Sequence, residues 1–224
     1  MSEPLTLAEI LAVLGNRRSA RDLQRYFLGV GGPAFTGGQF ERLGGGGDLP
    51  EFANIVTTAD LIAVQLLSVQ VRPDRALDLL QGQLGRQFAA ELTQIPADVE
   101  LGADKALSLI VEGGHADQAW RMLRDAGGIG WVTAGKLLAR KRPKLVPVYD
   151  EVVSCALGTG TGFWEWLHGK LREEDGVLAQ GLDALHAQAG LHAAVSRLRV
   201  LDVVVWMRHR DEHSGSGCPG LQLP

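Results

Sequence analysis

The chain has 224 residues, of which 46% are hydrophobic and 21% are charged, and its formal net charge is −4. These values are typical of a soluble globular protein with a sizeable core, built as one domain or one domain with a lobe. The mild acidity argues against a protein that coats nucleic acid, although a local basic patch can still bind it. The sequence carries neither an apolar run of membrane length nor a charged-then-apolar leader, so we expect a cytoplasmic protein with no membrane partner.

Helical signals follow one another along the chain. Thr6 is placed to cap a first helix that ends at Leu14, with Glu9 three residues after the cap. Further helices are expected from residues 17, 57, 73, 88, 103, 116, 131, 151, 162, 177 and 197, and the one from residue 57 is expected to be buried because it is apolar nearly all round. Convincing alternating strand patterns are absent, so the fold class is mostly α. We expect a single α-helical domain over residues 1–210, followed by a polar, glycine-rich and disordered tail at 211–224.

Two early segments have two readings each. The second helix carries Arg17, Arg18, Arg21 and Arg25, which form either a solvated basic face or a phosphate-contacting one. The glycine-dense segment from Gly31 to Pro50 is either a long loop that packs Phe35 and Phe40 on the body and lines a site, or a disordered surface loop. A nucleotide-binding P-loop is not expected there, because no Lys-Ser/Thr pair follows the glycines.

The most informative stretch runs from Gly127 to Val153. Gly128-Ile129-Gly130 forms a tight turn between two helices, because glycine permits positive φ. A helix follows from Trp131 to Arg140 and is ended by Pro143. The next segment is extended, and its last residue, Asp150, is placed to cap another helix.

This layout resembles the helix-hairpin-helix module of base-excision DNA glycosylases. The matching residues are Gly128-Ile129-Gly130, Thr133-Ala134 and Val148-Tyr149-Asp150, in the same order and at a similar separation, within a module at residues 116–156. The chain is also similar to a group of actinobacterial proteins of unknown activity that share its KLLARKRP and VPVYD core. The glycosylase resemblance implies a helical bundle whose hairpin amides at Gly128 and Gly130 hold a phosphate of duplex DNA, and whose Asp150 carboxylate is catalytic in base excision repair.

The residues around this module also have two interpretations each. Asp150 either stabilises an oxocarbenium-like transition state or only caps a helix. The cations after the hairpin either contact DNA phosphate or lie solvated at a helix end. Together with the hairpin glycines and Thr133, the candidate DNA-binding residues are Lys136, Arg140, Lys141, Arg142 and Lys144. Trp131 and Tyr149 either stack on a flipped base or belong to the core.

Some positions depart from the glycosylase pattern. Asp125 lies beside the hairpin, where an acidic residue does not help phosphate binding, and Glu151-Val152 replaces the usual Thr-His after the catalytic Asp. Val132 occupies the place of the lysine nucleophile of bifunctional members, so strand cleavage through a Schiff base is not expected.

Metal and cofactor sites are not expected from the sequence. Cys155 and Cys218 are far apart and form no disulfide or metal pattern, which excludes the iron–sulfur cluster of some glycosylases, and the six histidines form no close-spaced set. The leading hypothesis is therefore a cofactor-free, monofunctional DNA N-glycosylase that excises a modified base. The alternative is a non-catalytic DNA- or protein-binding module that retains the same fold.

Overall fold

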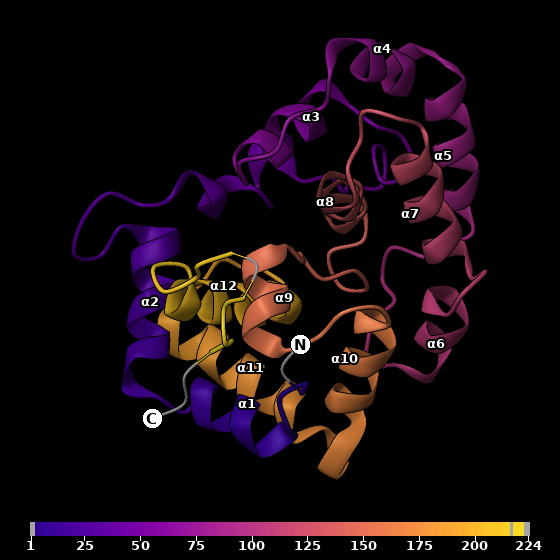
Figure 1. Ribbon diagram of the computed structural model, residues 1–224. Helices are drawn as coiled ribbons and strands as arrows, with labels where there is room; N and C mark the ends of the chain where they lie inside the picture. The colour runs from indigo at the N-terminus through magenta and orange to yellow at the C-terminus, as the bar shows by residue number, and fades with distance from the viewer. Residues whose placement is uncertain (1–2, 216, 222–224) are drawn as a thin grey trace. The chain divides into compact units, whose positions relative to one another are not determined.

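The computed structural model describes residues 3–215 and 217–221. Within these residues the chain forms α-helices and three short 3₁₀ helices, and its only bridge of the β type is an isolated one between Gly160 and Gly162. The expected all-α class is therefore confirmed. The chain divides into two compact units (Figure 1): unit 1 comprises residues 1–35 and 148–224, and unit 2 comprises residues 36–147. Two compact units are compatible with one folding domain, so the single domain over 1–210 stays a prediction.

Unit 1 is built from the two ends of the chain. Helices α11 and α12 pack against each other, α1 and α2 pack on both of them, α9 packs on α12, and α10 packs on α11 (Figure 1). The bounds are α1 (Leu7–Leu14), α2 (Arg17–Leu28), α9 (Glu151–Leu157), α10 (Phe163–Arg172), η3 (Glu173–Gly176), α11 (Val177–Ala189) and α12 (Arg197–His209).

Unit 2 contains the helices of the middle of the chain. Helix α7 packs against α5, α6 and α8, while α3 packs on α8 and α4 packs on α5. The bounds are η1 (Thr36–Gln39), η2 (Leu43–Gly45), α3 (Thr58–Gln65), α4 (Pro73–Gln81), α5 (Gln83–Thr93), α6 (Asp104–Ile110), α7 (His115–Asp125) and α8 (Trp131–Lys141).

The helix starts follow from local capping chemistry. Thr6 and Glu9 form a reciprocal capping box at α1, and Thr57 and Asp60 form the same arrangement at α3. Pro73 occupies the first turn of α4, where its missing N–H costs no helical hydrogen bond. The predicted short helix at 88–92 is longer in the structure, because α5 already begins at Gln83.

The glycine-dense segment between α2 and α3 is folded onto its neighbours. In unit 1, the ring of Phe35 stacks on Tyr26 with centroids 5.2 Å apart. In unit 2, Phe40 is 1% exposed, and the chain around it forms η1 and η2. Of the two readings of this segment, the structure therefore supports the packed loop.

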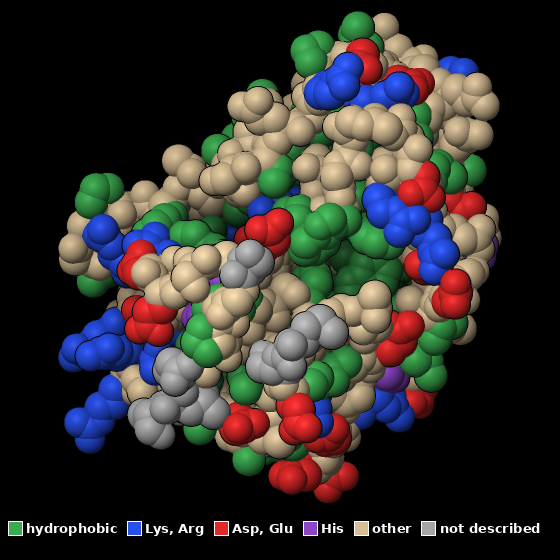
Figure 2. Space-filling model, in the orientation of Figure 1, with side chains coloured by type: hydrophobic (Ala, Val, Ile, Leu, Met, Phe, Trp, Pro, Cys, Tyr) green, Lys and Arg blue, Asp and Glu red, His purple; other side chains and the backbone are tan. Residues whose placement is uncertain are grey.

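Unit 1 also carries charged groups in two different settings. Arg17, Arg18 and Arg21 of α2 are exposed, and Figure 2 shows basic side chains projecting where α2 lies. Arg199 and Asp202 of α12 instead form a buried ion pair, and Arg199 also donates to the hydroxyl of Tyr26 over 2.8 Å.

The segment after α12 was expected to be a disordered tail. Residues 216 and 222–224 of it lie outside the described residues. In the described part, the amide of His213 donates to the carbonyl of His209, and the amide of Cys218 donates to the carbonyl of Gly215. Among all described residues, no helix is both long and apolar enough to cross a bilayer.

Candidate nucleic-acid interface

A tight connection at residues 126–130 joins α7 to α8. Gly127 and Gly128 have φ of 70° and 75°, in the region that glycine enters without steric cost. Ile129 is 2% exposed and anchors the turn in the core, while Gly130 takes an extended conformation and caps α8. Because α7 and α8 pack on each other, the predicted helix–turn–helix hairpin exists in unit 2.

The hairpin offers backbone donors at a helix N-terminus. Within residues 3–215 and 217–221, the amides of residues 127–130 donate to no backbone carbonyl. Helix α8 adds the positive end of its dipole. A methyl group placed on Gly130 would meet no atom within 4 Å, so the space beside this residue is open. Such a site suits a phosphate oxygen.

A cation that the sequence analysis missed lies beside the hairpin. A Cβ atom on Gly128 would lie 3.0 Å from Cδ of Arg72, which precedes α4. The Arg72 side chain is 68% exposed and pairs with Asp74 at 3.1 Å. Since Arg72 and Gly128 are far apart in sequence and no spacing rule links them, only the folded chain reveals this neighbour.

The acidic residue that departs from the glycosylase pattern is paired. Arg124 donates to both carboxylate oxygens of Asp125 at 2.7 Å and 3.0 Å, and these hydrogen bonds lower the pKa of Asp125. The Arg124 guanidinium also lies 4.8 Å from the ring centre of Trp120, whose Nε1 donates to the carbonyl of Trp131. Trp131 is 36% exposed at the start of α8, which leaves part of its ring at the surface.

Most of the cations expected to contact DNA lie inside unit 2. Lys136, Arg140, Lys141 and Arg142 are each at most 4% exposed, and Thr133 is also buried, whereas Lys144 is exposed. Lys136 donates from Nζ to the carbonyl of Leu67 over 2.9 Å. The structure therefore gives these four cations internal partners, because α8 is covered by segments distant in sequence.

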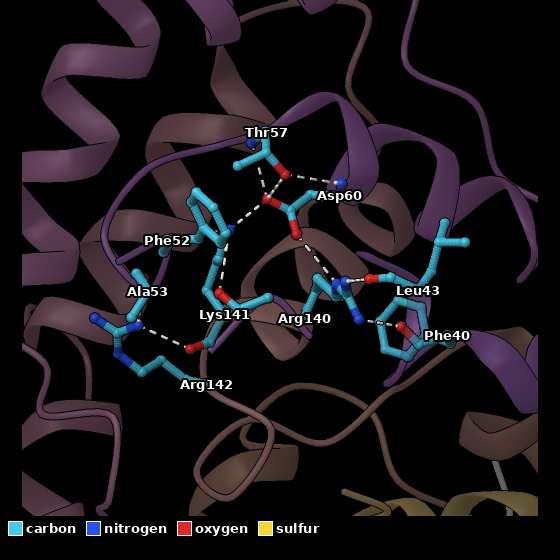
Figure 3. A network of polar contacts seen from close by, with 10 residues as sticks. Phe40, Leu43, Phe52, Ala53, Thr57, Asp60, Arg140, Lys141 and Arg142 are labelled. Carbon is cyan, nitrogen blue, oxygen red and sulfur yellow. Dashed lines mark hydrogen bonds and ion pairs between the residues drawn. The ribbon is translucent and has the colours of Figure 1, made fainter. Parts of the chain in front are cut away.

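Asp60 forms ion pairs with two of these cations (Figure 3). Its carboxylate pairs with Nε of Arg140 at 3.1 Å and with Nζ of Lys141, and it also accepts from the amide of Thr57 at 2.8 Å. Both cations also donate to carbonyls of the surrounding loop. Arg140 donates to the carbonyls of Phe40 and Leu43, and Lys141 donates to those of Gly47 and Phe52. Burial lowers the pKa of Lys141 although Asp60 opposes the shift.

Arg142 holds a second set of carbonyls. It donates to those of Ile95 at 2.6 Å and Ala53 at 2.7 Å, and to the side chain of Asn54 at 2.6 Å. Burial lowers the pKa of Arg142 to about 10. Arg140, Lys141 and Arg142, which we call the cation triplet, thus fix the loop between η1 and α3 and the end of α5 onto α8.

Asp150 lies at the start of α9 in unit 1. Its Oδ1 accepts from the amides of Val152 and Val153, each at 3.1 Å, so the predicted helix cap is confirmed. The side chain is half-buried and rigidly held. The adjacent Tyr149 stacks on Phe163 with centroids 3.9 Å apart, and its hydroxyl donates to Ser154 at 2.8 Å. Tyr149 is therefore part of a packed cluster of unit 1.

Unit 1 also brings together two cysteines and two histidines. The ligand atoms of Cys155, His209, His213 and Cys218 all lie within 4.8 Å of one another. This differs from the expectation that these residues form no metal-ligand pattern. The difference arises because α9 packs on α12, which carries Cys155 to the end of α12. The sequence does hold one signal of it, namely the short spacings from His209 to His213 and from His213 to Cys218.

The described residues form an all-α fold with a glycine turn between two packed helices, α7 and α8. The model of a family of unknown function, DUF6308, matches residues 19–209, and the chain belongs to this family. The matched part spans both units and the hairpin, and it ends before His213 and Cys218. No curated protein and no solved structure matches the chain.

Proposed function

We propose that this protein binds duplex DNA through the hairpin at residues 126–130 and acts as a monofunctional, glycosylase-like helix-hairpin-helix protein. The observation that carries the proposal is the open hairpin, whose amides at residues 127–130 precede α8 and whose Gly128 lies beside the exposed Arg72. Backbone amides and an arginine are groups that hold DNA phosphate without reading the sequence. The paired state of Asp125 supports the proposal, because Arg124 offsets its charge.

Asp150 is the group proposed for base excision. In such a reaction water adds to C1′ of the deoxyribose, the C1′–N bond breaks, and the base leaves with the bonding electrons and takes up a proton. A fixed carboxylate beside the sugar stabilises the positive charge that develops and can accept the proton of the attacking water. Asp150 meets the requirement of fixed placement, since two amides hold its Oδ1. Trp131, partly exposed at the hairpin, is the aromatic group proposed to stack on DNA.

A second candidate is a non-catalytic DNA- or protein-binding module. The packing of Tyr149 favours it, because Phe163 covers the ring that was expected to stack on a flipped base. The internal partners of Lys136 and of the cation triplet also remove four phosphate contacts from the expected set.

The binding half of the proposal is tested with a pair of variants at Gly130. The residue caps α8 with φ −72° and ψ 165°, and no atom obstructs a new side chain. Asp and Asn are both favoured at this position of a helix and have the same shape. We expect Gly130→Asn to bind a duplex oligonucleotide nearly as well as wild type, and Gly130→Asp to bind at least about tenfold more weakly, because its charge repels the phosphate. Equal affinities of the two variants would remove the hairpin from the interface.

The catalytic half is tested with a panel of damaged duplexes. Asp150→Asn is the matched variant, since asparagine also caps α9 well. We expect wild type to release a modified base from one member of the panel and Asp150→Asn to lose that activity while binding is kept. Excision by both proteins would exclude Asp150 as the essential carboxylate, and DNA binding with no excision by either would support the second candidate.

A further inference from the structure

The end of α12 and the start of the following segment hold side chains that no part of the proposed DNA interface uses. His209 is the last residue of α12 and is fully buried, and its Nε2 lies 3.4 Å from Sγ of Cys155 and 3.3 Å from Sγ of Cys218. His213 follows one helical turn later and is held by the bond from its amide to the carbonyl of His209. The four ligand atoms lie within 4.8 Å of one another.

The two distances from Nε2 of His209 suit a tetrahedral ion. Zinc bonds of about 2.3 Å to sulfur and about 2.0 Å to nitrogen, at tetrahedral angles, place S and N about 3.5 Å apart. The two measured N···S separations, 3.4 Å and 3.3 Å, are close to this value. Two sulfurs and two imidazoles are also the donor set that selects zinc among common divalent ions.

The polar groups of the cluster are otherwise poorly satisfied. Nδ1 of His209 and Nδ1 of His213 are buried and have no hydrogen-bond partner among the described residues. A divalent ion with two thiolates is neutral overall, so it relieves the cost of placing the cluster in a half-buried setting.

We propose that unit 1 binds one Zn²⁺ ion through Cys155, His209, His213 and Cys218, and that the ion clamps the segment after α12 onto α9. Four protein ligands complete the tetrahedron and leave no position for water or substrate, so the site is structural. Helix α9 has only seven residues and begins beside Asp150. The ion therefore fixes the helix that positions this carboxylate, whether or not the protein proves to be a glycosylase.

Metal content of the purified full chain is the first test. We expect about one zinc per wild-type chain and loss of most of it in His213→Ala and Cys218→Ser. His213 lies beyond α12 and is only half-buried, so its loss leaves the helical core intact. His192→Ala is the matched control, because His192 is exposed and its ring accepts from the nearby amide of Ala194. This variant retains the ion.

Cobalt substitution reports the ligands directly. Metal-free wild type titrated with Co²⁺ is expected to give the visible bands of a tetrahedral ion together with a thiolate charge-transfer band, both absent in Cys218→Ser. Zinc is expected to raise the melting temperature of metal-free wild type and not that of His213→Ala. Any of three results overturns the proposal. Wild type carries no zinc and gives no thiolate band, wild type contains a Cys155–Cys218 disulfide instead, or His213→Ala holds zinc as well as wild type does. Failure of DNA binding leaves this result unaffected.

Discussion

Removing the carboxylate of Asp60 is expected to destabilise the protein more than any other single loss of charge in unit 2. Asp60 is 1% exposed and pairs with two equally buried cations, Arg140 and Lys141. It also closes the capping box of α3 through the amide of Thr57. Asp60→Ala therefore leaves two buried cations without a counter-charge and the amide of Thr57 without its acceptor, while the cap that the Thr57 hydroxyl provides is kept.

The magnitude follows from these two losses. Breaking a buried ion pair by removing one partner costs about 3–5 kcal/mol. Loss of the hydrogen bond from the Thr57 amide costs about 1 kcal/mol more. We expect Asp60→Ala to lower the free energy of unfolding by about 4–6 kcal/mol, which is a large part of the total stability of a typical domain. Asp60→Asn keeps a group that can accept from Thr57 and is expected to lose about 3–5 kcal/mol, the share of the charge.

The assay is chemical denaturation of the full chain, followed by circular dichroism. Asp98→Asn is the control, because Asp98 is 78% exposed and its pair with Lys105, at 3.8 Å, lies in solvent. Exposed pairs of this kind contribute about 0–1 kcal/mol. If Asp60→Asn and Asp98→Asn have the same stability, the buried network does not hold unit 2 together and the argument from burial is wrong.

Three further predictions concern packing and charge in both units. A Cβ on Gly47 would lie 2.5 Å from the carbonyl oxygen of Arg140, so Gly47→Ala is expected to lower the free energy of unfolding by about 1–3 kcal/mol. Its control is Gly169→Ala, in the middle of α10 with open space around it, which is expected to raise the free energy of unfolding by about 0.5–1 kcal/mol in the same denaturation assay. Burial raises the pKa of Asp22 above 3.8, although Arg208, Arg18 and Arg210 oppose the shift, so stability falls as the pH rises from 3.8 to the folded pKa, and the full loss is present above it. Asp22→Asn is therefore expected to be more stable than wild type at neutral pH and equal to it below pH 3.8, where both chains are neutral at this position; an advantage that persists in acid contradicts the assignment. Tyr26→Phe removes the hydroxyl that accepts from the buried Arg199 and is expected to cost about 1.5–3 kcal/mol, whereas a loss below 0.5 kcal/mol in thermal unfolding would show that this hydrogen bond adds nothing.

The helix pattern could be predicted from the sequence because its determinants are local. Thr6 with Glu9, Thr57 with Asp60, Pro73 and Ser196 each act on an amide or a φ angle within three residues. The hairpin glycines and the cap at Asp150 belong to the same class of signal. The start of α5 was missed, because Gly82 offers no side-chain cap, and the three short 3₁₀ helices were not predicted.

The environment of the charged residues could not be predicted in the same way. A lysine or arginine at a helix end is usually solvated, and Arg140 is buried only because Asp60, Phe40 and Leu43, 80 to 100 residues away, fold over it. The proximity of Cys155 to His209 is likewise set by the packing of α9 on α12, across 54 residues. Contacts at such separations depend on the tertiary arrangement, which no local periodicity encodes.

The most direct test of the DNA-binding proposal is to follow the backbone amide resonances of the protein by NMR as an undamaged duplex oligonucleotide is added. We expect the amides of Gly128, Ile129, Gly130 and Trp131 to shift together, and the shifts to weaken as salt is raised, as for other phosphate contacts. Shifts confined to the exposed arginines of α2, with the hairpin amides unchanged, would contradict it.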